Sequence, residues 1–464
     1  MASLSLLSIF GLLPVACLAV VTIQDPSDVI PPSAWAADNA IVPDYNVPFI
    51  ATQPSPIQAA YTYDSRKKSV SVDHQSYTVN KNDTSVILVT DGAKFDASYI
   101  DVLKYGYSSN LLTASFYGFN AAVNVANGSE ATLKNVNITV HNGAANIYSY
   151  GTGTVVHVDN AWLYSSGPVS HGLYASGNGT IIAHNVQQFS GGMRSSSFSG
   201  DSPVGDVYVY NSVAHAAGVG SATFYALGTI YAENVQSISE KGPVVFMDGA
   251  QNATLINCDS TAGLLGGVAI FSSQIRTSGA SLKLKNSRIT TLGKTMPGLW
   301  FGNTIINVDI DTTEINTQSG VLVTANYSQI TQDFDYYAGY ADNNNLLPAL
   351  VYATVSESKL KGDLVAYNGS YISWKLQDHT SWTGAAYDGA SAGKAGTFDV
   401  ALDSSSNWTL TKDTKVQNFT DGDRTLGNIQ SAGFTLYYNA SAGQSKWLGG
   451  KTVKLNGGGV AKPL

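Results

Sequence analysis

Cysteine is nearly absent from this 464-residue chain, which has only Cys17 and Cys258. We expect Cys17 to leave with an N-terminal targeting segment, so Cys258 has no partner in the mature chain and an intrachain disulfide is excluded. A small scaffold stapled by disulfides is excluded with it. An exported protein without such staples needs a large core.

Charge is also scarce, at 12% of residues, and the formal net charge is −8. The longest basic run is Arg66-Lys67-Lys68, which is too short to favour nucleic acid or an anionic membrane as a partner. No stretch after the N-terminus approaches the roughly 18 apolar residues of a spanning helix. We therefore expect no nucleic-acid partner and no membrane span, and Gly457–Leu464 lacks a GPI-type tail.

Methionine is rare (4 residues), whereas glycine (45) and tyrosine (26) are abundant, which favours strands and turns over helices. The apolar run from Leu4 to Val15, with Cys17-Leu18-Ala19 after it, predicts a signal peptide over residues 1–19. Residues 20–68 are proline-rich without alternation and are predicted to form an extended arm. Residues 69–464 form the remaining domain, and the mature protein is expected to be secreted, either extracellular or associated with a cell wall.

Asparagine recurs at intervals of 25, 25, 26, 23, 23 and 29 residues, a period that is typical of a solenoid. Two residues before each asparagine the side chain is apolar, and the intervening one is mostly polar, which is strand parity. The sequence therefore predicts an all-β, single-stranded, right-handed parallel β-helix with an internal asparagine ladder. The seven asparagines are Asn135, Asn160, Asn185, Asn211, Asn234, Asn257 and Asn286.

The pattern continues after the asparagines end. The register slips so that Thr312 takes the next ladder position, and the segment Leu376 to Trp382 matches Leu402 to Trp408 at an offset of 26. Leu360 fits the same slot 22 residues before Trp382. The C-terminal third is thus predicted to be more solenoid, about 15 turns in all, with a lateral loop over residues 322–340.

Five stretches resemble the adhesin-like, right-handed parallel β-helix proteins of the pectin-lyase-like fold class, which are exported by bacteria and fungi. The resemblance implies a fold and an extracellular setting rather than an activity. The chain departs from the family at Asp248–Asn252 and at Met193–Ser196. The five stretches are FYGFNAAV (116–123), SHGLYASGNGTI (170–181), GVGSATFYALGTI (218–230), PVVFMDGAQNATLIN (243–257) and SSNWTLTKDTKV (405–416).

Ten Asn-x-Ser/Thr sequons predict a glycosylated surface if the protein passes through a eukaryotic secretory pathway, although some will be chance matches in such a composition. They are Asn82, Asn127, Asn137, Asn178, Asn252, Asn326, Asn368, Asn407, Asn418 and Asn439.

A stripe of aromatic and polar residues is predicted on successive coils, with Tyr174, Arg194, Tyr225 and Asp248 as its ligand-binding candidates. Aromatic rings offer flat apolar surface to sugar C–H bonds, and Arg and Asp can bond hydroxyls or carboxylates. The alternative is structural, since strand alternation would turn about half of the stripe's rings into the core.

Catalysis is weakly indicated. A polyuronate lyase needs a base with Ca²⁺ or a cation, and a hydrolase needs two carboxylates about 5–10 Å apart. Arg194, Asp248 and His171 are the nearest candidates, without a tight acidic cluster around them. No cofactor is indicated. Asp309 and Asp311 with Asn307 offer half of a Ca²⁺ site, and His157, His184 and His215 lie outward without metal spacing.

The sequence therefore favours a secreted, non-catalytic β-helix protein with an adhesin-like or glycan-binding role and a polysaccharide or cell-surface glycan as its partner. Two alternatives stay open: a polysaccharide lyase or glycoside hydrolase on the same fold, and a secreted accessory to another enzyme. Fold alone does not choose among them.

Overall fold

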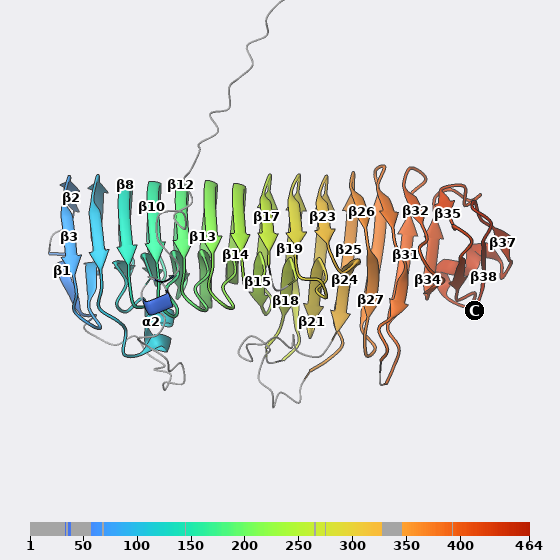
Figure 1. Ribbon diagram of the computed structural model, residues 1–464, viewed down its shortest axis with the longest axis horizontal. Helices are drawn as coiled ribbons and strands as arrows, with labels where there is room; N and C mark the ends of the chain where they lie inside the picture. Colours follow the sequence, from blue (N-terminus) through green and yellow to red (C-terminus); the bar gives the residue numbers. More distant parts are fainter. Residues whose placement is uncertain are drawn as a thin grey trace, which may run out of the picture.

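The protein is an elongated parallel β-solenoid of about 15 turns (Figure 1). The computed structural model describes residues 33, 36–38, 57–66, 69–143, 145–263, 266–273, 275–326, 346–391 and 393–464. Strands of successive coils lie side by side along the long axis, from β1 and β2 at one end to β38 at the other (Figure 1). The predicted all-β solenoid is confirmed.

The first half of the described chain contains the helix α2 (Leu111–Tyr117) among its strands. The strands are β1 (Ala59–Tyr63), β2 (Ser69–Asp73), β3 (Ser76–Val79), β4 (Ser85–Val89), β5 (Lys94–Ser98), β6 (Asp101–Lys104), β7 (Val123–Ala126), β8 (Glu130–Val140), β9 (Ile147–Tyr150), β10 (Val155–Ser165), β11 (Leu173–Ser176), β12 (Gly179–Ser190), β13 (Phe198–Ala216), β14 (Phe224–Ser239), β15 (Val245–Asp248), β16 (Asn252–Ile256), β17 (Asp259–Ala262), β18 (Val268–Phe271) and β19 (Thr277–Lys285).

The second half adds the 3₁₀-helix η3 (Gly443–Leu448) near the C-terminus. Its strands are β20 (Arg288–Thr291), β21 (Leu299–Gly302), β22 (Thr304–Asp311), β23 (Glu314–Thr317), β24 (Val321–Asn326), β25 (Leu350–Ser356), β26 (Lys359–Lys361), β27 (Asp363–Ala366), β28 (Tyr371–Gln377), β29 (Ser381–Thr383), β30 (Ala386–Asp388), β31 (Thr397–Leu402), β32 (Asn407–Thr409), β33 (Thr414–Val416), β34 (Asn418–Asp421), β35 (Ile429–Gln430), β36 (Thr435–Tyr438), β37 (Val453–Lys454) and β38 (Val460–Pro463).

The core is a continuous column of apolar side chains inside the coils. Val158 on β10 pairs with Leu133 on β8 and with Ala183 on β12, and all three are at most 1% exposed. The residues two before each asparagine therefore point inward, as their parity predicted. Each fully buried aliphatic side chain contributes about 1.5–3 kcal/mol to the stability of the fold, because its apolar surface is removed from water.

The asparagines stack on one another, but on the outside of the solenoid. Six of the seven are exposed and Asn135 is half-buried, so the prediction of an internal ladder is wrong. Hydrogen bonds run from Asn160 to Asn135 (2.6 Å), from Asn234 to Asn211 (2.9 Å) and from Asn286 to Asn257 (2.6 Å), whereas Asn185 donates to Asp159 (2.9 Å).

Backbone conformation explains this correction. All seven asparagines have φ between 47° and 56°, in the left-handed region that asparagine tolerates better than most residues. A left-handed residue breaks strand alternation, so the side chain that parity would place inside turns outward while the chain rounds a corner. On the next two coils, Thr312 (φ 48°) and Glu357 (φ 47°) occupy the corner position that Asn286 holds on its own coil.

A ladder of short side chains lies inside, one residue after the corner. The backbone N–H of Cys258 donates to Ser287 Oγ (3.0 Å), that of Ser287 to Thr313 Oγ1 (3.2 Å), and that of Thr313 to Ser358 Oγ (3.0 Å). All four residues are at most 5% exposed. These hydroxyls satisfy buried backbone donors that the turn leaves without strand partners. Cys258 is a free thiol within this ladder.

The C-terminal third is a continuation of the solenoid, as the repeat predicted. Trp382 pairs with Leu360 on one side and with Trp408 on the other, and the two indole rings stack 4.8 Å apart. Trp408 Nε1 donates to the carbonyl of Gly384 (3.0 Å). The last strands, β36, β38 and β37, close this end, with β37 antiparallel to β38.

The N-terminal expectations fall mostly outside the described residues. The signal peptide and Cys17 lie there entirely, as does most of the proline-rich arm. Within the arm's predicted range, β1 pairs with β4, so the described solenoid begins at Ala59 rather than at residue 69. Of the lateral loop predicted over residues 322–340, the first five residues belong to β24, and the rest lies outside the described ranges. Among the described residues, no helix is both long and apolar enough to cross a membrane.

Candidate functional site

The predicted aromatic stripe lies on the sheet that contains β9, β11, β13, β14 and β15. Tyr174 pairs with Tyr148 and with Ser199, which in turn pairs with Tyr225, so Tyr174 and Tyr225 stand two coils apart in one row. Asp248 pairs with Phe271 on the next coil. Tyr225 itself pairs with Phe246, so Asp248 lies two residues beyond the row that contains Tyr174 and Tyr225, and the predicted one-coil step from Tyr225 to Asp248 is out of register.

Tyr174 is buried, at 1% exposure, because α2 covers it. Asn110 caps the start of this helix through a bond from Thr113 N (2.9 Å), and Gly118 ends it at φ 70°. Ser115 of the helix shares a hydrogen bond with Tyr174 Oη (2.6 Å). The interpretation of Tyr174 as an outward platform ring is therefore wrong, since the inserted helix occupies the space that a ligand would need.

His171 is also enclosed, at 4% exposure. Its Nδ1 accepts from Ser196 N (3.0 Å) and lies 2.8 Å from Ser199 Oγ, while its ring packs 4.0 Å from that of Tyr174. Burial lowers the pKa of His171 to about 3. A neutral, covered imidazole cannot exchange protons with a bound sugar near pH 7, so His171 is unsuited to the catalytic role considered for it.

The other stripe candidates are half-buried. Arg194 lies in the left-handed region (φ 53°), and its backbone N–H donates to the carbonyl of Val219. Tyr225 stacks on Phe246 at 5.7 Å, and Asp248 accepts from Ser273 N (2.8 Å). Burial raises the pKa of Asp248.

A further buried carboxyl, that of Asp201, belongs to the same face. Asp201 is 6% exposed and accepts hydrogen bonds from Tyr174 Oη and from Ser202 N (2.7 Å). Burial raises the pKa of Asp201 to about 6, and the negative charge of Asp248 acts in the same direction. The charge of Asp248 therefore influences the protonation of Asp201 on the same face.

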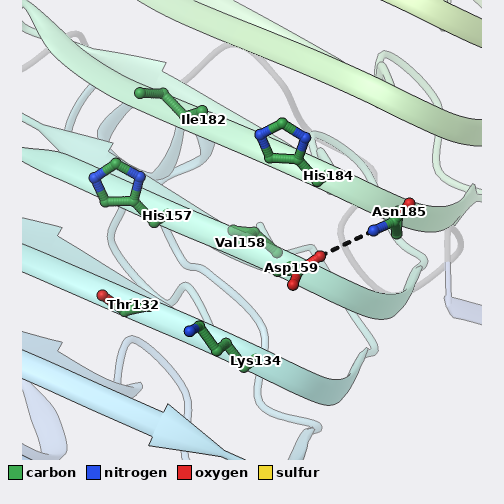
Figure 2. Close-up of a pocket in the computed structure, with 8 residues that line it drawn as sticks. All are labelled: Thr132, Lys134, His157, Val158, Asp159, Ile182, His184 and Asn185. Atoms are coloured by element: carbon green, nitrogen blue, oxygen red, sulfur yellow. Dashed lines mark hydrogen bonds between the residues drawn. The ribbon is translucent and has the colours of Figure 1, made fainter.

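A second face carries an open groove of about 350 Å³ on the outside of β8, β10 and β12 (Figure 2). Its walls are side chains that alternate outward on either side of buried residues such as Val158. In Figure 2 the imidazoles of His157 and His184 stand above the strands on neighbouring coils, and Lys134 lies one coil below Asp159. The groove is lined by Thr132, Lys134, His157, Val158, Asp159, Ile182, His184 and Asn185.

Register explains why these residues meet. Lys134, Asp159 and His184 immediately precede the corner asparagines, so stacking of the coils places them in one row. Asn185 turns outward at its corner and donates to Asp159 Oδ1 (2.9 Å; Figure 2), which orients that carboxylate along the groove.

Three tyrosines extend the groove onto the next two coils, and we call Tyr208, Tyr210 and Tyr231 the tyrosine patch. The ring of His184 stacks on that of Tyr210 at 4.6 Å and 12°. Tyr210 lies 5.6 Å from Tyr231, whose hydroxyl donates to Glu233 Oε2 (2.9 Å). All three tyrosines are half-buried, so each exposes part of a ring. Groove and patch together span β8 to β14, about 20 Å at ~4.8 Å per coil.

The sequence interpretation placed His157 and His184 outward, which is where they lie, but did not connect them into a site. The signal was present, because the residues just before successive asparagines read Lys134, Asp159, His184, Tyr210 and Glu233. His215 is different: it is 7% exposed and its Nε2 lies 2.8 Å from Glu240 Oε1.

The carboxylates considered for Ca²⁺ face lysines of the preceding coil. Asp311 lies 3.2 Å from Lys285, and Asp309 lies 3.9 Å from Lys283. Within the described ranges, no group of three or more His, Cys, Asp and Glu side chains is arranged to hold a metal ion.

None of the ten sequon asparagines is fully buried. Six are exposed, and Asn326, Asn368, Asn418 and Asn439 are half-buried. The surface is therefore compatible with glycan attachment at each of them, although attachment itself stays a prediction.

Comparison with known proteins adds no name to these observations, because no family model and no curated protein matches the chain.

Proposed function

We propose that the protein is a secreted, non-catalytic β-helix protein that binds a glycan along the groove and the tyrosine patch, in an adhesin-like role. The observation that carries the proposal is the direct continuity of the groove with exposed aromatic surface through the His184–Tyr210 stack. Half-exposed rings present flat apolar faces to sugar C–H bonds, and Lys134, Asp159 and Thr132 can bond hydroxyls.

The make-up of the groove supports binding rather than turnover. Glycoside hydrolysis requires two carboxyl groups on either side of the scissile bond. Among the eight lining residues Asp159 is the single carboxylate, and Asn185 holds one of its oxygens. A right-handed helix and membership of the adhesin-like, pectin-lyase-like class belong to the same proposal, as do secretion and association with a cell surface.

A hydrolase or lyase is the second candidate, and one observation favours it. Asp201 and Asp248 lie on the other face with raised pKa values, as a general acid requires near pH 6. Against it, α2 and Tyr174 cover Asp201.

A glycan array and a product assay on the same purified protein distinguish the two functions. On a glycan array we expect retention of one class of glycan, and with that class in solution we expect neither new reducing ends nor unsaturated products. Product release that disappears in Asp201→Asn or Asp248→Asn would establish the enzyme instead. Retention of no glycan at all would exclude the proposed binding function.

A further inference from the structure

The charged groups of the groove differ in whether a neighbouring side chain already bonds them. Asp159 is bonded by Asn185, and the nearby Glu130 forms an ion pair with Lys94 (2.6 Å). Glu233, at the far end of the patch, accepts from Tyr231. By contrast, no carboxylate lies within ion-pair distance of Lys134 in the part of the chain that the structure describes. The anionic groups are therefore engaged, while the cationic ones face solvent.

Other titratable groups flank the groove without entering it. Asp96 on β5 pairs with Thr132 on β8, and Asp206 on β13 accepts a hydrogen bond from Thr229 N (3.0 Å). Tyr208 and Tyr231 of the tyrosine patch add little charge to the groove, because burial raises the pKa of both phenols.

The net charge of the lining depends on its two imidazoles. Lys134 and Asp159 cancel, so the lining is neutral when His157 and His184 are uncharged and carries two positive charges when both are protonated. Imidazole is the side chain that gains its charge between about pH 8 and pH 5. A sugar carboxylate, with an ordinary pKa of about 4, or a sulfate stays anionic over that range.

We propose that the groove selects an anionic glycan, carrying carboxylate or sulfate groups, and binds it more tightly in mildly acidic solution. This inference rests on the proposed glycan-binding function and names its ligand class. The rings of the tyrosine patch hold the sugar plane, and the cations of the groove hold the anionic substituent. The net charge of −8 on the whole chain repels such a ligand at neutral pH, which sharpens the dependence on pH.

The test is a glycan array that holds neutral, carboxylated and sulfated glycans, probed at pH 5.0 and pH 7.5. We expect the retained glycans to be anionic and their half-saturation concentrations to be about fivefold lower at pH 5.0, as two partly exposed ion pairs would give. The array distinguishes a carboxylate from a sulfate ligand directly. Added salt should weaken retention at pH 5.0.

Matched variants assign the effect. The double variant His157→Gln/His184→Gln should remove the pH dependence, and Lys134→Gln should weaken anionic glycans at both pH values. His379→Asn, which changes an exposed histidine on a distant coil (φ 61°), should leave the wild-type profile unchanged. Equal melting temperatures would show that all variants are folded.

The outcomes separate this inference from the function it rests on. Retention of neutral glycans only overturns the anionic selection, and retention that is the same at both pH values in the wild type overturns the role of the two histidines. In both cases glycan binding stands. Retention of no glycan overturns both.

Discussion

Each asparagine of the outer column lies in the left-handed region, where most L residues are strained by about 1–2 kcal/mol. Asn234 has φ 56°, and its Nδ2 donates to Asn211 Oδ1 (2.9 Å). Asparagine therefore recurs at this corner mainly because the corner requires a left-handed backbone conformation. The exposed hydrogen bond between neighbouring side-chain amides adds a smaller stabilisation.

Substitutions at Asn234 separate this explanation from a buried amide ladder. Asn234→Gly should change the free energy of unfolding by less than about 1 kcal/mol, since glycine adopts this conformation freely. Asn234→Val should cost about 1–2 kcal/mol, because a β-branched residue is strained there. Thermal and denaturant melts measure both. A loss of several kcal/mol in the glycine variant would instead indicate a structural role for the amide.

Asp421 is a second residue whose surroundings make a measurable prediction. It is 2% exposed, and burial raises its pKa to about 6, although the hydrogen bonds that it accepts from the backbone N–H of Asp423 and from the Asn428 side chain act in the opposite direction. Asp421 Oδ2 and Asn428 Oδ1 are both buried, and neither has a hydrogen-bond partner among the described residues, while Asn428 Nδ2 donates to Asp421 Oδ1 (3.0 Å). A proton on Oδ2 would suit this acid and amide pair.

Because the folded pKa of Asp421, about 6, exceeds its usual value of about 4, its contribution to stability is fully present below about pH 4 and is lost as the pH rises from 4 through 6. Asp421→Asn imitates the protonated acid. We expect the melting temperature of the variant to exceed that of the wild type at pH 8, and by a smaller margin at pH 5. A variant that melts lower at both pH values would show that the carboxylate form is the one the fold requires.

The elements differ in how far they could be predicted. Strand parity and the 25-residue period place Leu133, Val158 and Trp382 correctly, because each depends on contacts between equivalent positions of neighbouring coils. The helix α2 interrupts the period between β6 and β7, and nothing in the spacing of later coils shows that it folds over Tyr174. The spacing of residues in the sequence therefore could not predict how exposed the side chains of the stripe are.

The contact between α2 and the stripe can be tested at Tyr174. Tyr174→Phe keeps the ring but leaves Asp201 without one of its donors, so we expect a loss of about 1–3 kcal/mol in the free energy of unfolding. Cleavage within residues 111–117 under limited proteolysis should also become faster. Unchanged stability and protection would mean that α2 is held by its apolar contacts alone.

At the scale of the whole molecule, the solenoid turns a short sequence pattern into long rows of side chains. One row is the outer column of asparagines, and the row beside it contains Lys134, Asp159, His184 and Tyr210, so the fold that stabilises the chain also assembles its candidate site. That row could be written down from the sequence once the asparagines were aligned. Its depth and its continuity with the tyrosine patch required the actual register and side-chain packing.

The most direct test of the account is a calorimetric titration of the best array glycan against two tyrosine variants on the same sheet. Tyr210→Ala removes a ring of the patch, and Tyr352→Ala removes an outward ring, 43% exposed, on the distant strand β25. We expect Tyr210→Ala to weaken binding by about 1 kcal/mol or more, roughly fivefold, with its melting temperature retained. Tyr352→Ala should bind as the wild type does. Equal affinities for all three proteins would contradict the assignment of glycan binding to the groove and the tyrosine patch.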